Sequence, residues 1–138
     1  MRQNLEPKVW GPHAWFFLES IAMGYPTNPT STDIEKTKLF FSSLKYVIPC
    51  LKCRQNFDKH SRNNPLTDDV LSSNETFFKW IVDMHNLAKK DKRTYNDTFQ
   101  YYMNKYNNKS TTKYTIYKII IIILALMLIT FLLKKYVL

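Results

Sequence analysis

Hydrophobic residues recur at helical rather than strand spacing along most of the chain. In the first such stretch, Trp15, Leu18 and Ala22 lie three and four residues apart, which predicts one apolar helix face. Pro12 suits the first turn of a helix and Gly24 suits its end. The pattern therefore predicts a first helix that begins near Pro12 and ends near Gly24.

Two further helices are predicted around the cysteine pair. The one from about Asp33 to Ile48 follows Ser31 or Thr32 as its cap and carries apolar side chains at helical spacing. The next is predicted from about Cys50 to Arg62, because a preceding proline suits a helix entry and Asn63-Asn64-Pro65 suits an end. The cysteines then lie in the first turn of this third helix.

The helical pattern continues with a fourth and a fifth segment. An apolar face at helical spacing runs from about Asn74 to Lys90, and Thr94 followed by Asp97 predicts the cap of a fifth helix that ends near Tyr106. No stretch alternates apolar and polar residues with the period of a strand. The expected fold class is therefore all-α, a four-helix bundle plus a short fifth helix, with a C-terminal transmembrane helix.

The last part of the chain is uniformly apolar. The run from Ile119 to Leu133 carries no charge, and about 15 helical residues span about 22 Å, against about 30 Å for a bilayer's hydrocarbon core. Extending the run back past Lys118, whose ammonium can reach the headgroups, brings it close to spanning length. We therefore expect a domain over residues 1–106, a polar linker over 107–114 and a membrane anchor over 115–138.

The N-terminal residues lack the apolar core of a secretory signal. A single C-terminal span then predicts a tail anchor, with the domain in the cytosol. Asn74, Asn96 and Asn108 begin glycosylation sequons, so glycosylation of the membrane-bound protein would contradict this orientation.

Charge and glycine content narrow the range of ligands. The net charge of +9 favours an anionic partner, which could be a phosphate-bearing cofactor, an acidic lipid surface or nucleic acid. The dense basic run from Lys89 to Arg93 is typical of a solvated helix end, and no nucleic acid is expected. With only Gly11 and Gly24, the chain has no glycine-rich phosphate loop, so side chains and helix ends must hold any nucleotide.

The candidate chemistry lies in the segment Pro49-Cys50-Leu51-Lys52-Cys53-Arg54, which contains both cysteines of the chain. Such a pair can close a redox-active disulfide, and the positive end of a helix stabilises a thiolate. A disulfide that merely staples the turn is the alternative, although so short a loop stabilises little. A thioredoxin-like domain would need strands. Zinc would need about four ligands at spacings that Cys50, Cys53, His60 and His85 do not show, so no metal is expected.

Several blocks occur in order between residue 10 and about residue 106. They are Trp10-Gly11-Pro12-x-x-Trp15, Ala22-x-x-Tyr25-Pro26, Pro49-Cys50-x-x-Cys53-Arg54, Pro65-Leu66, and the region from Phe78 and Trp80 to His85-Asn86. Together they resemble the Erv/ALR family of FAD-linked sulfhydryl oxidases. The short length and single cysteine pair are most similar to members encoded by large cytoplasmic DNA viruses, which implies a host-cell or virion membrane.

The resemblance implies an FAD-binding helical bundle, usually a homodimer, with thiol oxidase activity. It implies that Cys53 faces the flavin, while Cys50, exposed at the helix start, exchanges with a dithiol protein substrate such as a shuttle redox protein. Electrons would pass from the dithiol to FAD and then to molecular oxygen, giving hydrogen peroxide. The cofactor-contacting residues that it implies are Trp10, Trp15, Tyr25, Trp80, His85 and Asn86, with Lys89, Lys90 or Arg93 toward the pyrophosphate.

The chain departs from the family pattern at three positions. Glu19 stands where the family has a His in the first helix, Asn56 stands where a His follows the second cysteine, and Lys89 ends the motif His-Asn-x-x-Asn. Glu19 and Asn56 can still hydrogen-bond to a cofactor, and Lys89 can meet an anionic phosphate. The departures leave open an alternative, a non-catalytic tail-anchored membrane scaffold with a degenerate flavin site.

Overall fold

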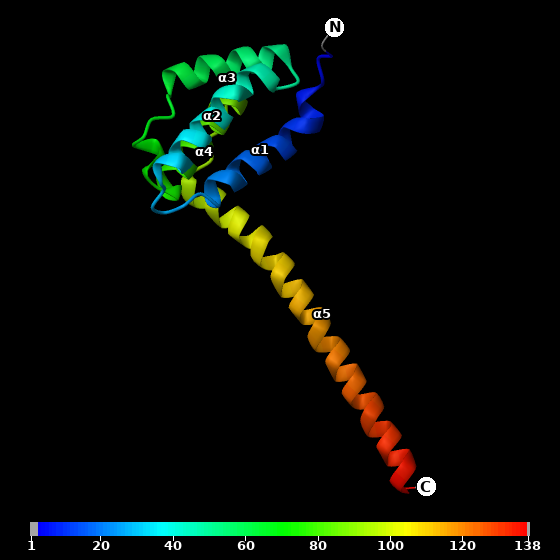
Figure 1. Ribbon diagram of the computed structural model, residues 1–138. Coiled ribbons are helices and arrows are strands. Elements are labelled where there is room, and N and C mark those ends of the chain that lie inside the picture. Colours follow the sequence, from blue (N-terminus) through cyan, green and yellow to red (C-terminus); the bar gives the residue numbers. More distant parts are fainter. Residues whose placement is uncertain (1–2, 138) are drawn as a thin grey trace. The chain divides into compact units, whose positions relative to one another are not determined.

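The computed structural model describes the backbone of residues 3–137 and the side chains of residues 3–107 and 114–134. Its elements are α1 (Pro7–Met23), α2 (Ser31–Val47), α3 (Leu51–Asn63), the short 3-10 helix η1 (Val70–Ser72), α4 (Asn74–Lys89) and α5 (Tyr95–Val137) (Figure 1). No strand occurs in this part of the chain. The predicted all-α class is confirmed.

Two prolines near the start of the chain both suit the first turn of a helix. The structure uses the earlier one, so α1 begins at Pro7 and Pro12 lies inside the helix. Pro12 has no N–H to donate to the carbonyl of Lys8 one turn earlier. The predicted start of the first helix was therefore too late.

Side chains cap the following helices. Thr30 precedes α2, one residue before the cap that the sequence suggested, because it forms a reciprocal capping box with Asp33. The Asp33 N–H donates to Thr30 Oγ1 at 3.2 Å, and the Thr30 N–H donates to the Asp33 carboxylate at 2.8 Å. The predicted cap of α5 is confirmed, since the Asp97 N–H donates to Thr94 Oγ1 at 3.1 Å.

Helix α4 supplies most of the hydrophobic core. It packs against α1, α3 and η1, while α2 packs against α3. Phe41 of α2 adds edge-to-face contacts to Phe77 and Trp80, with ring centroids 5.3 and 5.6 Å apart. The buried residues of α4 are Phe77, Phe78, Trp80, Ile81, Val82, Met84 and His85.

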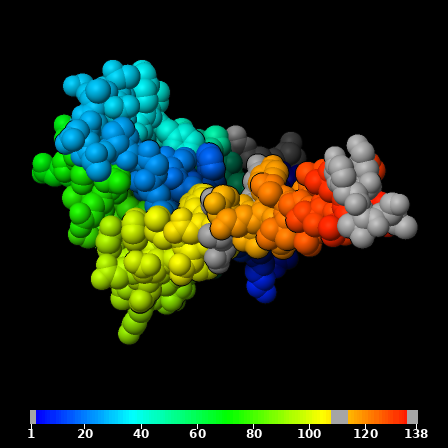
Figure 2. Space-filling model, turned by 90° about the horizontal axis from the view of Figure 1, so that it is seen from below, coloured from blue at the N-terminus to red at the C-terminus, as the bar shows by residue number. Residues whose placement is uncertain are grey.

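The loop after α1 and the start of α2 are tied to the segment that contains η1. Tyr25 Oη donates to the carbonyl of Leu71 at 3.2 Å, and Lys38 forms an ion pair with Asp68. Figure 2 shows these two parts of the chain, in light blue and green, side by side on one face. The contact of Tyr25 with Leu71 holds the C-terminal end of α1 near the start of α4. Both helices contribute to the site described below.

The chain divides into two compact units, Met1–Thr98 and Phe99–Leu138, with the boundary inside α5. This helix does not end near Tyr106 as predicted but continues to Val137, because a helix once formed gains one backbone hydrogen bond per added residue. Its part Tyr114–Lys134, of 21 residues and mean hydropathy 2.8, is long and apolar enough to cross a membrane. The limits of the domain, linker and anchor stay a prediction.

Candidate active site

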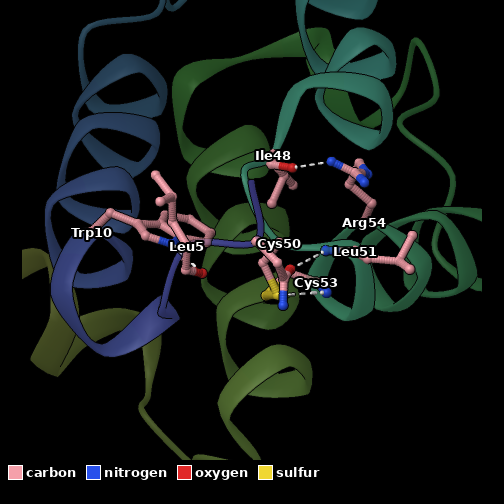
Figure 3. The surroundings of a disulfide bond; sticks show 8 residues. Leu5, Trp10, Ile48, Cys50, Leu51, Cys53 and Arg54 are labelled. Carbon is pink, nitrogen blue, oxygen red and sulfur yellow. Dashed lines mark hydrogen bonds between the residues drawn. A yellow bond between two sulfur atoms is a disulfide. The ribbon is translucent and has the colours of Figure 1, made fainter. Parts of the chain in front are cut away.

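The cysteine pair forms the start of α3, as the sequence predicted. Cys50 is the N-cap residue, and a disulfide joins it to Cys53 in the first turn, with the two Cα atoms 5.1 Å apart (Figure 3). The Cys53 N–H donates to Cys50 Sγ at 3.2 Å. Because the N-terminus of a helix favours negative charge, a Cys50 thiolate would be stabilised when the disulfide opens.

Cys50 is not exposed, contrary to the expectation for the cysteine that meets the partner. Only 5% of its surface is accessible. The N-terminal residues pair with the chain on both sides of it: the Leu5 N–H donates to the carbonyl of Pro49 at 2.8 Å, and the Leu51 N–H donates to Asn4 Oδ1 at 2.9 Å. Figure 3 shows Leu5 among the side chains around the disulfide.

A cavity of about 600 Å³ lies beside the disulfide. Of the two cysteines, Cys53 is the one that lines it. Its volume lies within the range of about 300–1,000 Å³ that is usual for cofactor and small-molecule sites. The walls are mostly apolar and come from all four helices of the bundle, with Trp10, Trp15, Phe17, Phe40, Leu44, Val47, Phe57 and Met84 among the lining residues.

The predicted site residues Trp10, Trp15, Asn56 and Lys89 also line the cavity. The sequence did not single out Lys8, an exposed cation that lines it as well. The two lysines place positive charge at an otherwise apolar site, which suits a ligand with a flat apolar part and an anionic part.

Gly11 forms part of the cavity wall. It is buried within α1, yet a Cβ added at this position would meet nothing within 4 Å. A buried glycine inside a helix costs stability relative to alanine, by about 1 kcal/mol. Because no atom lies within 4 Å of that Cβ position and Gly11 lines the cavity, the space over its backbone belongs to the cavity and is available to a ligand.

A buried network of charged side chains lies behind this wall. The Glu19 carboxylate, fully buried, is 2.7 Å from His85 Nδ1 and accepts a hydrogen bond from Arg93 Nη2 at 2.7 Å. The Arg93 guanidinium also contacts His85 Nδ1. The His85 ring stacks on Trp15, with centroids 4.2 Å apart and planes 7° apart. Trp15 thus connects the network to the cavity.

The protonation of His85 follows from its surroundings. Burial lowers its pKa from the ordinary 6.5, and the hydrogen bond to Glu19 opposes this shift only in part. At Nδ1 the Glu19 carboxylate can only accept and the Arg93 guanidinium can only donate, so either tautomer of the neutral ring finds a partner at this atom. His85 Nε2 and Arg93 Nε are buried and have no hydrogen-bond partner among the described residues, which is rare unless a ligand supplies one.

Six of the predicted cofactor residues lie outside the cavity lining: Glu19 and His85 belong to the buried network, and the other four are Tyr25, Trp80, Asn86 and Lys90. Tyr25 and Trp80 are buried in the core, where the Trp80 indole donates to a backbone carbonyl at 3.0 Å. The Asn86 amide bonds to the backbone of Arg93 at 2.8 and 3.2 Å and so holds the loop that carries this arginine. Lys90 is exposed and ends α4 in the left-handed conformation, with φ 54°. Direct cofactor contacts by these six stay predictions.

The fold and the site together define a class of protein: a small helical bundle whose Cys-x-x-Cys disulfide borders an apolar cavity of cofactor size. The model of the Erv1 / Alr family matches residues 12–107 of the chain. The chain therefore belongs to the Erv1 / Alr family, as the resemblance of the sequence blocks had indicated.

The relatives come from viruses and eukaryotes. The chain is 46% identical over 84 residues to a probable FAD-linked sulfhydryl oxidase of Acanthamoeba polyphaga mimivirus, a match that covers 61% of this chain and 59% of the relative. It is 30% identical over 83 residues to the mitochondrial FAD-linked sulfhydryl oxidase ERV1 of Saccharomyces cerevisiae, covering 60% of this chain and 42% of that protein. The chain thus spans about half the length of these two relatives.

A solved structure supports the fold. The FAD binding domain of Erv1 from Saccharomyces cerevisiae is 25% identical and superposes with a TM-score of 0.60, covering 67% of this chain and 90% of that one. The match includes most of that domain, so the bundle described above shares its helical fold.

Proposed function

We propose that this protein is an FAD-dependent thiol oxidase that forms disulfides in partner proteins. The observation that carries the proposal is the position of Cys53: one sulfur of the disulfide lies in the wall of a cavity large enough for a cofactor. The relatives support it, because the mimivirus protein is named as a probable FAD-linked sulfhydryl oxidase. Electrons would pass from the partner to the cysteine pair, then to FAD, then to oxygen, giving hydrogen peroxide.

The residues present fit FAD. The apolar walls that include Trp10 and Trp15, and the open space over Gly11, suit a flat ring system. Lys8 and Lys89 can meet phosphate charge. The buried and unpartnered His85 Nε2 can form a hydrogen bond with a ligand behind the Trp15 wall. When bound, FAD supplies a two-electron acceptor next to Cys53.

The cysteines carry out the exchange with the partner. A partner thiolate attacks Cys50 Sγ, a mixed disulfide forms, and Cys53 leaves as a thiolate. A second thiolate of the partner then attacks the partner's own sulfur in the mixed disulfide, which closes the partner's disulfide and releases Cys50 as a thiolate. The N-terminus of α3 stabilises the negative charge that appears on Cys50.

We also propose that the chain is tail-anchored and dimeric, with the domain on the cytosolic side. The apolar segment Tyr114–Lys134 supports the anchor. Exposed apolar side chains on α1 and α2 outside the cavity lining, which include Val9, Leu39 and Tyr46, support a second copy as partner.

The absorption spectrum tests the proposal. The full chain, purified in detergent, should be yellow and should consume oxygen when dithiothreitol is added. A folded, colourless protein that consumes none would refute the oxidase and would favour the non-catalytic membrane scaffold instead. Bound flavin without oxygen uptake would also refute the oxidase.

A further inference from the structure

The segment before α1 runs past the disulfide and pairs with its flanks. The Leu5 N–H donates to the carbonyl of Pro49, and Asn4 Oδ1 accepts from the Leu51 N–H. Trp10 Nε1 donates to the carbonyl of Leu5 at 3.3 Å and so links this segment to α1. We call residues 3–6 the N-terminal strap.

The strap satisfies two backbone groups that α3 cannot satisfy by itself. Leu51 is the first residue of α3, and a first-turn N–H has no acceptor within its own helix. The carbonyl of Pro49 precedes the cap residue and lies outside the helix. One acceptor and one donor, on either side of Cys50, are thus available to a neighbouring extended chain.

The position of the strap conflicts with access to the disulfide. Cys50 is only 5% exposed, yet a thiolate must approach Cys50 Sγ for the exchange to begin. Leu5 is itself 47% exposed, and one hydrogen bond between neutral groups changes an equilibrium by about tenfold or less. The strap is therefore held weakly enough for another chain to replace it.

We propose that the backbone at Pro49 and Leu51 is the docking site for an extended segment of the partner polypeptide, next to its reactive cysteine. The strap occupies this site until the partner displaces it. A backbone N–H of the partner then donates to the Pro49 carbonyl, and an oxygen of the partner accepts from the Leu51 N–H. This inference rests on the proposed function, because it describes how the substrate of that reaction binds.

The docked segment brings the partner's cysteine to Cys50. The partner thiolate forms a bond to Cys50 Sγ as the Cys50–Cys53 bond breaks, and Cys53 takes the electron pair. The second partner thiolate then displaces Cys50, so the partner loses two electrons and the cysteine pair gains them. A small dithiol can carry out the same exchange but cannot replace both backbone hydrogen bonds, so extended polypeptides are the preferred substrates.

The first test measures whether the strap slows the attack of a thiolate on Cys50. The full chain, with its disulfide closed, is mixed without oxygen with a reduced, unstructured peptide that carries two cysteines. Samples are quenched by alkylation, and mass spectrometry gives the fraction of the peptide that has formed its disulfide, which counts every electron pair taken up whether it stays on Cys50 and Cys53 or passes to bound flavin. Asn4→Ala and Leu5→Pro each remove one strap hydrogen bond and should speed reduction about fivefold.

The exposed Gln3 provides the matched control, and Gln3→Ala should leave the reduction rate unchanged. Equal rates for all three variants and the unmodified chain would overturn the role of the strap. Circular dichroism is used to check that each variant keeps its helical fold, and the Asn4→Ala variant still tests the strap if the proline disturbs the chain.

The second test examines the docking site itself. A series of peptides, each N-methylated at one backbone position near the first cysteine, is compared on the Leu5→Pro protein. Methylation at one position should slow reduction about fivefold, because it removes the N–H that donates to Pro49. If no position matters, an extended segment does not dock there and the proposal is refuted. The assay needs neither flavin nor oxygen, so failure of the proposed oxidase activity would be seen separately.

Discussion

The Glu19 carboxylate lies 2.7 Å from His85 Nδ1, although the two residues are 66 positions apart in the chain. Both side chains are almost fully buried, and Arg93 supplies the positive charge that a buried carboxylate needs. Glu19 stands where the family pattern has a histidine, so this chain holds His85 with a carboxylate of its own. The pair joins α1 to α4 at the back of the cavity wall.

Replacing Glu19 by glutamine should destabilise the fold. Glu19→Gln keeps the size of the side chain but leaves the Arg93 charge without its partner, and breaking a buried ion pair costs about 3–5 kcal/mol. Because Arg93 is partly exposed, we expect the free energy of unfolding to fall by about 2–3 kcal/mol. Urea denaturation measures this change.

The exposed Glu35, which pairs with Lys36, is the matched control. Glu35→Gln should change stability by less than about 0.5 kcal/mol. An equal effect at both positions would mean that the buried pair contributes no more than a surface pair.

The stability of the fold should depend on pH through His85. Its pKa is lowered in the folded state by burial, so the unfolded chain binds the proton more readily. The contribution is complete above the unfolded pKa of about 6.5 and is lost as the pH falls toward the lower folded pKa. Melting temperatures between about pH 7.5 and 5 should therefore fall on acidification. The fall should be smaller in His85→Gln and unchanged in His13→Gln, which replaces an exposed histidine.

Much of this architecture could be predicted from the sequence, since helical periodicity and caps such as Thr94 depend on local chemistry. The length of α5 could not, because the polar residues after Tyr106 resemble a linker and are compatible with helix. The pairing of the N-terminal strap with the residues around Cys50 could not be predicted either, because local patterns do not show that Asn4 bonds to Leu51, 47 positions later. The buried network could have been predicted in part from Glu19. This residue stands four positions after Trp15, on the apolar face of the helix, where a carboxylate requires a positively charged partner.

Substitution of Gly11 tests whether FAD occupies the space over this residue. Gly11→Ala places a methyl group where no atom lies within 4 Å, and it should stabilise α1 in the flavin-free protein by about 0.5–1 kcal/mol. The same methyl group narrows the cavity, so the fraction of protein purified with FAD should fall. Ser42→Ala, at an exposed position of α2, is the control that should leave flavin content unchanged. Full flavin content in Gly11→Ala would show that FAD does not approach this glycine.

The two cysteines should behave differently when each is left alone. With Cys53→Ser, the remaining Cys50 should form a stable mixed disulfide with a single-cysteine peptide supplied as its symmetric disulfide: one copy leaves as a thiol, and neither the protein nor the attached copy then holds a second thiol. With Cys50→Ser, the remaining Cys53 lies in the cavity wall and should form much less of the mixed disulfide with the peptide. Non-reducing electrophoresis measures the mixed disulfide, and equal trapping by both variants would contradict the assigned direction. Neither variant should consume oxygen with any thiol.

The apolar part of α5 should hold the protein in a bilayer. A helix of 21 residues is about 31 Å long, which matches a hydrocarbon core of about 30 Å. A charge at the middle of the span costs about 2.5–3.5 kcal/mol, whereas a long basic side chain near the end can reach the headgroups. Leu124→Arg should therefore release much of the protein from liposomes in alkaline carbonate, while Ile116→Arg should remain bound. If alkaline carbonate releases the unmodified protein as readily as Leu124→Arg, α5 lies on the membrane surface instead of crossing it.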